Sequence, residues 1–329
     1  MISAPFVEEA LDSARRRGLD PAPLLEGAGL GGWAGESVSA ERYGALWLGI
    51  AWAIDDEFFG LGGRPMPLGS FTLLCQAVLH AGTLERALRR ALRFLAVVLG
   101  DPKGELVVAD GLAQIVLRDQ AGPRTPFAYR TYWIIVHGIM CWMVGRRIAL
   151  RLVDFRCAEP AQGGDYRLFF GAPVRFGRPL SRLAFDAGFL SLPVDRSEKA
   201  LKQFLRGAPA NILVRYRYDA GLAAAIRSRL RQIEPAEWPG FDHLAAQMRM
   251  PSSTLRHRLA QEGQTYRAIK DDIRRGLAIE WLVSGTRQVG EIAAELGFAE
   301  PSAFHRAFRK WTGQSPAAYR REVGRGDGC

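Results

Sequence analysis

Basic side chains gather on one side of a helix that the sequence predicts near its C-terminus. They are His305, Arg306, Arg309 and Lys310. The other side of this helix is an aromatic stripe at i, i+4 and i+7, made of Phe304, Phe308 and Trp311. Arginine and lysine donate hydrogen bonds to phosphate oxygens and base edges, and a buried stripe holds the helix rigidly while they do so. The chemistry that this pattern predicts is the binding of a nucleic acid.

This helix is the second part of a helix–turn–helix pattern that spans residues 288–316. The first helix of the pattern has an apolar face formed by Ile292, Ala293 and Leu296. Gly297 follows where a helix ends and the chain can take a positive φ, and Phe298 is expected to fill the corner. Pro301 stands among the first residues of the second helix, where a missing N–H does no harm.

A second copy of the pattern precedes it at residues 241–263. The corresponding apolar segments and residues are Leu244–Met248 for Ile292–Leu296, and Leu255 and Leu259 for Phe304 and Phe308. Identity between the copies is low, and their turns differ by one residue in length. Three further residues project from the second helix of this copy, namely Arg256, His257 and Arg258.

One long helix is expected between the two copies, over residues 265–283. Its apolar stripe consists of Ile269, Ile273, Leu277, Ala278 and Trp281. At ~1.5 Å per residue such a helix spans roughly 27 Å. A rigid spacer of this length could set two recognition helices about one duplex turn, roughly 34 Å, apart. Both helices could then enter successive major grooves on the same face of DNA.

This pair of motifs resembles the AraC/XylS family of bacterial transcription regulators. The residues that carry the resemblance are Arg256–Gly263, Ile292–Phe298 and Phe304–Pro316, followed by Tyr319 and Arg320. The N-terminal part is similar to the arabinose-binding-type effector domain of one branch of the family, which does not carry the cupin barrel of the sugar-sensing members. The segments that carry this similarity are Asp56–Leu61, Thr83–Leu88 and Phe169–Phe176.

The resemblance implies which residues contact DNA. Base contacts would come from Ser253, Arg256 and His257 in the first recognition helix, and from Glu300, Ser302, His305 and Arg306 in the second. Phosphates would be contacted by Arg306, Arg309 and Lys310. The chain departs from the family at Pro251-Ser252, where Ser-Pro is common, and at Ala299, where Ser or Asp is common. Both departures change the expected N-cap, and the second is expected to weaken it by about 1 kcal/mol.

Composition bounds the size and the class of the protein. A chain of 329 residues suggests two or three domains, and a hydrophobic fraction of 48% with 24% charged residues is ordinary for a globular protein. The net charge of +10 favours an anionic partner such as nucleic acid, although residues 222–329 contain only 17 Lys and Arg against 12 Asp and Glu. Four cysteines without CxxC spacing indicate a reducing compartment.

Neither a signal peptide nor a membrane span is expected. The first residues are acidic and lack an apolar core. The most apolar stretch, 132–144, is interrupted by His137 and is shorter than the ~20 residues that a span needs. We therefore expect a cytoplasmic protein that associates with the bacterial nucleoid when bound to DNA, with no membrane partner.

The N-terminal part mixes helical and extended patterns. Short β-rich runs at 105–110 and 112–118 are separated by Gly111, which indicates a hairpin, and 126–145 is predicted to be a core helix. The expected fold class is an α+β effector domain followed by an all-α domain of two helix–turn–helix motifs joined by a long helix. The expected segments are an effector domain at 1–195, a linker at 196–218, a DNA-binding domain at 219–322 with motifs at 241–262 and 288–311, and a flexible tail at 323–329.

The core helix offers candidates for effector binding. Tyr132, Trp133 and His137 could line an apolar pocket, although packing against the sheet is the more common fate of such residues. His137 and Cys141 share one helix face at i, i+4, which leaves open a metal or haem sensor. Two ligands without a third are weak evidence, so neither a metal nor a cofactor is expected.

The function that these observations favour is a one-component transcription regulator. Its expected partners are double-stranded promoter DNA, a small-molecule effector, RNA polymerase and a second copy of the chain. The resemblance favours an activator. An alternative is an enzyme domain fused to a DNA-binding module, but no convergent set of titratable residues is visible, so the protein is not expected to be an enzyme.

Overall fold

The computed structural model divides the chain into two compact units. The described residues are 1–161, 163–194, 196–213, 222–261, 264–283 and 287–324. The first unit comprises Met1–Gln162 and Arg175–Tyr216, and the second comprises Gly163–Val174 and Arg217–Cys329. An α+β unit with a sheet and a helical unit with two helix–turn–helix motifs confirm the predicted fold class.

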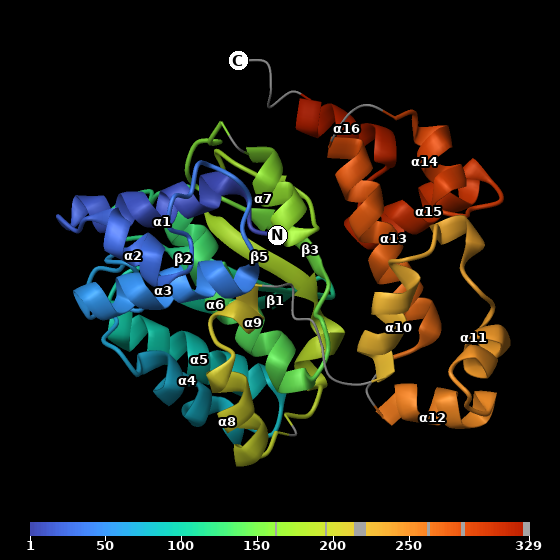
Figure 1. The fold of residues 1–329 in the computed structure, drawn as a ribbon, viewed down its shortest axis with the longest axis horizontal. Helices are drawn as coiled ribbons and strands as arrows, with labels where there is room; N and C mark the ends of the chain where they lie inside the picture. Colours follow the sequence, from blue (N-terminus) through green and yellow to red (C-terminus); the bar gives the residue numbers. More distant parts are fainter. Residues whose placement is uncertain (162, 195, 214–221, 262–263, 284–286, 325–329) are drawn as a thin grey trace. The chain divides into compact units, whose positions relative to one another are not determined.

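The first unit is built on a five-stranded sheet with the strand order β1-β2-β5-β3-β4 (Figure 1). The strands are β1 (Lys103–Ala109), β2 (Leu112–Arg118), β3 (Leu150–Asp154), β4 (Val174–Arg175) and β5 (Ser181–Asp186). β1 pairs with β2, β2 with β5 and β5 with β3, all antiparallel. Asp110 and Gly111 join β1 to β2 with φ values of 52° and 73°, so the predicted hairpin is confirmed.

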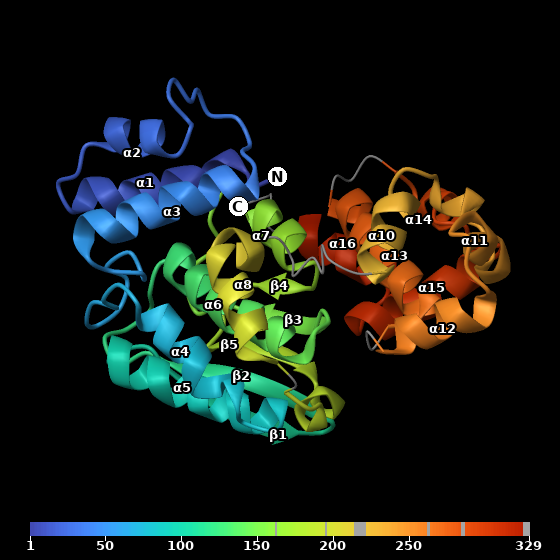
Figure 2. The same ribbon diagram turned by 60° about the horizontal axis from the view of Figure 1, so that its bottom comes forward.

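The first unit also contains helices. They are α1 (Ala4–Arg16), α2 (Pro21–Gly27), α3 (Ala40–Ile54), α4 (Ser70–Leu79), α5 (Leu84–Leu99), α6 (Pro126–Val144), α8 (Glu198–Arg206) and α9 (Ala210–Leu213), with the short 3₁₀ helix η1 (Ala187–Ser191). α5 packs along β1, while α1, α2 and α3 contact one another (Figure 2). Nearly every residue of α6 is buried, which makes it the core helix of the unit. Across the described residues, no helix has the length and apolar character to cross a membrane.

One buried carboxylate organises the loop between α3 and α4. Asp56 is 1% exposed, and its Oδ1 accepts hydrogen bonds from the N–H groups of Phe58 at 2.8 Å and Met66 at 3.0 Å. Its Oδ2 accepts a third from the Gly60 N–H at 2.9 Å. The adjacent Glu57 accepts from the N–H groups of Gly69 at 2.8 Å and Phe71 at 2.6 Å. This loop contains the Asp56–Leu61 segment, which carries part of the family resemblance. In this chain the carboxylates at its start bind backbone N–H groups and hold the loop in shape.

The described part of the predicted linker is folded. α8 and α9 belong to the first unit, and Ile212 and Leu213 are buried. α9 contacts α3 and α6, where glycine allows a close approach. A Cβ on Gly138 of α6 would lie 2.6 Å from the Ile212 Cβ. The periodicity of residues 207–213 is too short to predict such packing, and residues 214–218 of the predicted linker lie outside the described part.

The second unit is helical. Its elements are α7 (Gly163–Phe170), α10 (Leu222–Leu230), η2 (Pro235–Glu237), α11 (Phe241–Gln247), α12 (Ser252–Gln261), α13 (Tyr266–Val283), α14 (Val289–Glu295), α15 (Pro301–Thr312) and α16 (Pro316–Gly324). In Figure 1, α10, α11 and α12 group about one end of α13, and α14, α15 and α16 about the other. α16 was not among the helices predicted from the sequence.

α13 takes part in both hydrophobic cores of this unit. Its N-terminal half contributes Ile269 and Ile273 to a cluster with Leu244, Leu255 and Leu259. Its C-terminal half contributes Ala278, Ile279 and Leu282 to a cluster with Ile292, Ala293, Leu296, Phe304 and Phe308. Because one helix is buried in both cores, the two helix–turn–helix motifs are held to a common rigid element.

Candidate nucleic-acid interface

The first motif consists of α11, a turn and α12. The turn ends α11 through hydrogen bonds from the Arg249 N–H to the Ala246 carbonyl and from the Met250 N–H to the Ala245 carbonyl, both at 3.0 Å. Arg249 has a φ of 54°, a conformation that side chains other than glycine adopt at a cost. α12 begins at Ser252, whose hydroxyl donates to the Asp242 carboxylate of α11 at 2.6 Å.

The second motif repeats this turn. The Gly297 N–H donates to the Ala294 carbonyl at 2.8 Å, and the Phe298 N–H donates to the Ala293 carbonyl at 3.0 Å. Gly297 has a φ of 73°, and Phe298 packs against the Phe304 and Trp311 rings. The predicted helix end at Gly297 and the predicted corner at Phe298 are both confirmed. The two turns therefore share one hydrogen-bond pattern, with arginine in the first where the second has glycine.

Substitutions at these two turn positions should change stability in opposite directions. Arg249→Gly should raise the free energy of unfolding of the second unit by about 0.5–1 kcal/mol, because it removes a side chain from the left-handed region. Gly297→Ala should lower it by about 2 kcal/mol, because a Cβ is strained at this φ and would lie 2.8 Å from the Pro235 carbonyl oxygen. Hydrogen exchange of peptides over 241–261 and 288–312 measures both changes. Unchanged hydrogen exchange in Gly297→Ala would contradict the conclusion that this turn requires glycine at position 297.

The N-terminus of α15 differs from the expectation. Its N-cap residue is Glu300, and Ala299 lies one position earlier, so Ala299 is not the cap. Glu300 makes no side-chain hydrogen bond to the first turn, which leaves this helix end with Pro301 as its main local signal. The helix then runs to Thr312 and ends at Gly313, which has a φ of 85°.

Every residue that the sequence indicated for DNA contact is exposed. These residues are Ser253, Arg256, His257, Glu300, Ser302, His305, Arg306, Arg309 and Lys310. Their apolar neighbours on the same helices are buried, with Leu255 and Phe304 both at 0% exposure. Each recognition helix therefore has the two faces that the periodicity predicted.

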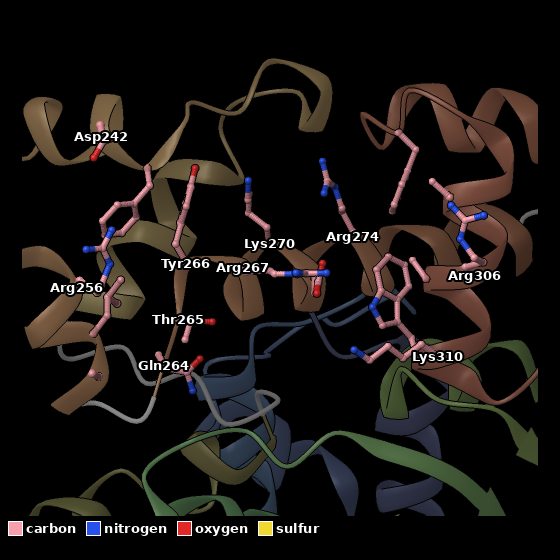
Figure 3. Close-up of a pocket in the computed structure, with 18 residues that line it drawn as sticks. Asp242, Arg256, Gln264, Thr265, Tyr266, Arg267, Lys270, Arg274, Arg306 and Lys310 are labelled. Atoms are coloured by element: carbon pink, nitrogen blue, oxygen red, sulfur yellow. The ribbon is translucent and has the colours of Figure 1, made fainter. Parts of the chain in front are cut away.

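A cleft of about 820 Å³ lies between the two recognition helices. Arg256 of α12 lines it from one side, and Arg306 and Lys310 of α15 line it from the other (Figure 3). The remaining six predicted residues are outside its lining. The floor is α13, which adds three basic residues that were not among the predicted contacts, Arg267, Lys270 and Arg274. Their spacing of i, i+3 and i+7 was a usable signal, because it places them on one helix face.

Comparison with known proteins decides the family. Residues 18–194 match the family described as the arabinose-binding domain of AraC transcription regulator, and residues 244–322 match a helix-turn-helix domain family. The chain belongs to the AraC family of transcription regulators. It is accordingly a regulator with an N-terminal ligand-binding domain and a DNA-binding domain, as the sequence predicted.

Three relatives show how far the similarity to other AraC-family members extends. The Ornithine utilization regulator of Pseudomonas aeruginosa is 30% identical over 78% of this chain and 76% of its own length. The regulator VirS of Mycobacterium tuberculosis is 26% identical over 94% of this chain and 93% of its own. The regulator VqsM of Pseudomonas aeruginosa is 34% identical over 49% of this chain and 51% of its own. All three relatives are named as regulators.

The cleft of this AraC-family protein concentrates positive charge. Six basic side chains line it, against the carboxylates of Asp242 and Asp271. Burial lowers the pKa of Lys270, and the neighbouring charges of Arg274 and Arg267 lower it further. Burial also raises the pKa of Asp271, which the charges of Arg267 and Arg274 oppose. An anion in the cleft would relieve the repulsion among these cations.

Arg274 joins the two motifs. Its Nε donates to the Leu296 carbonyl at 2.8 Å, at the end of α14. Its guanidinium lies 4.9 Å from the centre of the Phe298 ring in the second motif and 5.3 Å from that of Trp238, next to the first. Arg274 is therefore a positioning residue that connects the first motif, α13 and the turn of the second motif.

Arg256 has a defined support on the opposite side of the cleft. Its guanidinium lies 5.1 Å from the centre of the Phe241 ring, which belongs to α11. A cation over an aromatic face contributes about 0.5–1 kcal/mol at an exposed site. The contact restricts the side chain without using its N–H donors.

The effector candidates lie in the core of the first unit. Tyr132 and Trp133 are 0% exposed, and their rings make an edge contact at 5.5 Å. Burial raises the pKa of Tyr132. The indole N–H of Trp133 has no hydrogen-bond partner within the described structure, and neither has the hydroxyl of Thr131 beside it. Buried polar groups nearly always have a hydrogen-bond partner, so the Trp133 N–H and the Thr131 hydroxyl are unusual for a packed core.

His137 and Cys141 contact the segment that leads into β3. The His137 Nε2 lies 2.9 Å from the Ile148 carbonyl oxygen, and the Ile148 N–H donates to the Cys141 Sγ at 3.3 Å. The two side chains are 3.4 Å apart. In the part of the chain that the structure describes, no group of three or more His, Cys, Asp or Glu is placed to hold a metal ion. The His137 Nε2 and the Cys141 Sγ therefore join α6 to the segment that leads into β3.

Proposed function

We propose that α12 and α15 read base edges in two successive major grooves of a promoter. Ser253, Arg256 and His257 act in the first groove, and Glu300, Ser302, His305 and Arg306 act in the second. Phosphates are bound by Arg306, Arg309 and Lys310. The observation that carries this proposal is the cleft, because Arg256 from one recognition helix and Arg306 and Lys310 from the other line the same surface of one unit.

The ligand-binding domain takes residues 1–195 in this proposal, and its effector is a small organic metabolite. Buried polar atoms without a partner on α6 support a site near Tyr132, Trp133 and His137. Residues 196–218 couple this domain to a DNA-binding domain at 219–322. Of the predicted tail at 323–329, residues 323 and 324 end α16, and residues 325–329 lie outside the described part of the chain. The effector must bind one arrangement of the chain more tightly than another, because a ligand with equal affinity for both changes nothing.

The proposed regulator acts as an activator that contacts RNA polymerase and binds DNA as a homodimer. It works in the cytoplasm, where its promoter lies. The regulator from Pseudomonas aeruginosa named for ornithine utilisation supports a metabolic role, in which the effector belongs to the chemistry encoded beside the bound promoter. The effector of this chain is best sought among the substrates of that neighbouring operon.

Mapping of bound sites across the genome, followed by hydroxyl-radical footprinting of the strongest site, tests the proposal. We expect protection of two stretches about 10 base pairs apart on one face of the duplex, which is the spacing of successive major grooves. Titration of metabolites from the neighbouring operon should then shift the binding curve. Protection of a single groove by one chain would contradict the two-helix assignment.

A further inference from the structure

The surface of α13 between the two recognition helices has no role in the proposed base contacts. Arg267 is exposed on this surface, and Lys270 is partly buried with its Nζ 4.7 Å from the centre of the Tyr266 ring. Both residues line the cleft between Arg256 on one side and Arg306 and Lys310 on the other (Figure 3). The cations of the two recognition helices and of the linking helix therefore form one continuous surface.

Duplex geometry determines what this surface would meet. Two recognition helices in successive major grooves on one face have a minor groove, bordered by two phosphate strands, between them. α13 joins the two motifs and contributes to both of their cores, so it lies opposite this intervening stretch. Phosphates are the groups of the minor groove that a lysine or arginine on a helix surface reaches first.

The charges on α13 favour an anion at this position. Like charges three or four residues apart destabilise a helix, and Arg267, Lys270 and Arg274 form two such pairs. Arg274 already donates a hydrogen bond to the Leu296 carbonyl and contacts the rings of Trp238 and Phe298. Asp271 supplies the only carboxylate that α13 contributes to the described lining of the cleft. Arg267 and Lys270 are thus in excess over the acidic groups around them.

We propose that Arg267 and Lys270 bind the phosphates that border the minor groove between the two half-sites. α13 is then a third DNA-contacting element, which adds affinity without reading sequence. Asp271 opposes this contact, because its carboxylate lines the surface that the phosphates would approach, and the two negative charges repel each other. The proposal rests on the proposed function, since it assumes that α12 and α15 enter successive major grooves.

The salt dependence of the binding constant measures the number of phosphate contacts, because each contact releases counterions from the DNA. The full chain is titrated with the footprinted operator duplex and with a random duplex of equal length, across a series of salt concentrations. Arg267→Gln and Lys270→Gln should each reduce the slope of log K against log salt by about 1 on both duplexes, while Lys270→Arg should keep the wild-type slope. Arg229→Gln is the matched control, because Arg229 is exposed on α10 and does not line the cleft.

DNA in which chosen phosphates are replaced by uncharged methylphosphonates shows where Arg267 and Lys270 bind. Methylphosphonates placed only in the minor-groove stretch between the half-sites should weaken binding of the wild-type chain. They should have little effect on the Arg267→Gln, Lys270→Gln double variant, whose contacts are already lost. Asp271→Asn should change affinity in the opposite direction and tighten binding several-fold, because it removes a negative charge that faces phosphate.

The outcomes distinguish the proposed phosphate contacts of α13 from the proposed base contacts of α12 and α15. Unchanged salt slopes in both α13 variants, with methylphosphonates having no effect on wild type, would overturn the role of α13 while leaving α12 and α15 in place. A footprint that is insensitive to substitutions in α12 and α15 would overturn the proposed base-reading surface itself. Circular dichroism of each variant confirms that the fold is retained.

Discussion

Replacement of Arg256 and Arg306 together by alanine is expected to abolish specific DNA binding while the fold is retained. Both side chains are exposed, so no core packing is lost. A well-placed arginine on guanine contributes about 1–3 kcal/mol of discrimination. The two losses together should lower affinity for the operator by roughly 10³-fold, since each 1.4 kcal/mol is tenfold. Competition titrations of operator against random duplex at fixed moderate salt measure the specificity ratio.

A charge-matched control separates base reading from general electrostatics. Arg90→Ala with Arg93→Ala also removes two positive charges, from exposed positions on α5 of the first unit. This control should bind the operator within a few-fold of wild type. If the Arg256, Arg306 variant still footprints the same promoter at moderate salt, these residues do not read its sequence.

Asp56→Ala should be the most destabilising single substitution in the loop between α3 and α4. It removes the acceptor for three backbone N–H groups, of Phe58, Gly60 and Met66. Hydrogen bonds to a charged group contribute about 1.5–3 kcal/mol, and buried donors left without a partner cost more. We expect the first unit to lose about 3–5 kcal/mol of its free energy of unfolding. Hydrogen exchange of peptides over 56–71, together with thermal unfolding, measures the loss.

The neighbouring residue provides the comparison for Asp56. Asp55 is exposed and accepts one hydrogen bond, from the Leu68 N–H at 3.1 Å. Asp55→Ala should therefore cost less than about 1 kcal/mol. Equal unfolding temperatures for Asp56→Ala and wild type would show that the loop does not depend on its buried carboxylate. A loss of effector response without unfolding would instead place Asp56 near the ligand.

The helices of the second unit were predictable because their signals are local. The predicted motif at 288–311 corresponds to α14 and α15, and each of its outer bounds differs from theirs by one residue. Apolar periodicity and Gly297 determine both, since an apolar stripe needs burial and a positive φ favours glycine. The predicted helix at 265–283 likewise corresponds to α13. α9 was missed, because four residues are too few to show a period.

The roles of residues on the core helix could not be predicted from local sequence patterns. Tyr132, Trp133 and His137 have the composition of a ligand pocket and also of a packed core, and periodicity cannot separate the two. The structure buries Tyr132 and Trp133 completely and joins His137 to Ile148. It also reveals unpartnered polar atoms on α6, a feature that no pattern in the sequence indicates.

Sequence alone determined that two helix–turn–helix motifs exist, which faces of their recognition helices are apolar, and which basic residues lie opposite. It did so because a helix repeats its environment every 3.6 residues, a distance that the chain itself records. Tertiary structure decided that Arg256, Arg306 and Lys310 line one cleft and that Arg267 and Lys270 lie between them. That arrangement depends on the burial of α13 in two cores at once, and contacts between distant segments leave no local pattern to read.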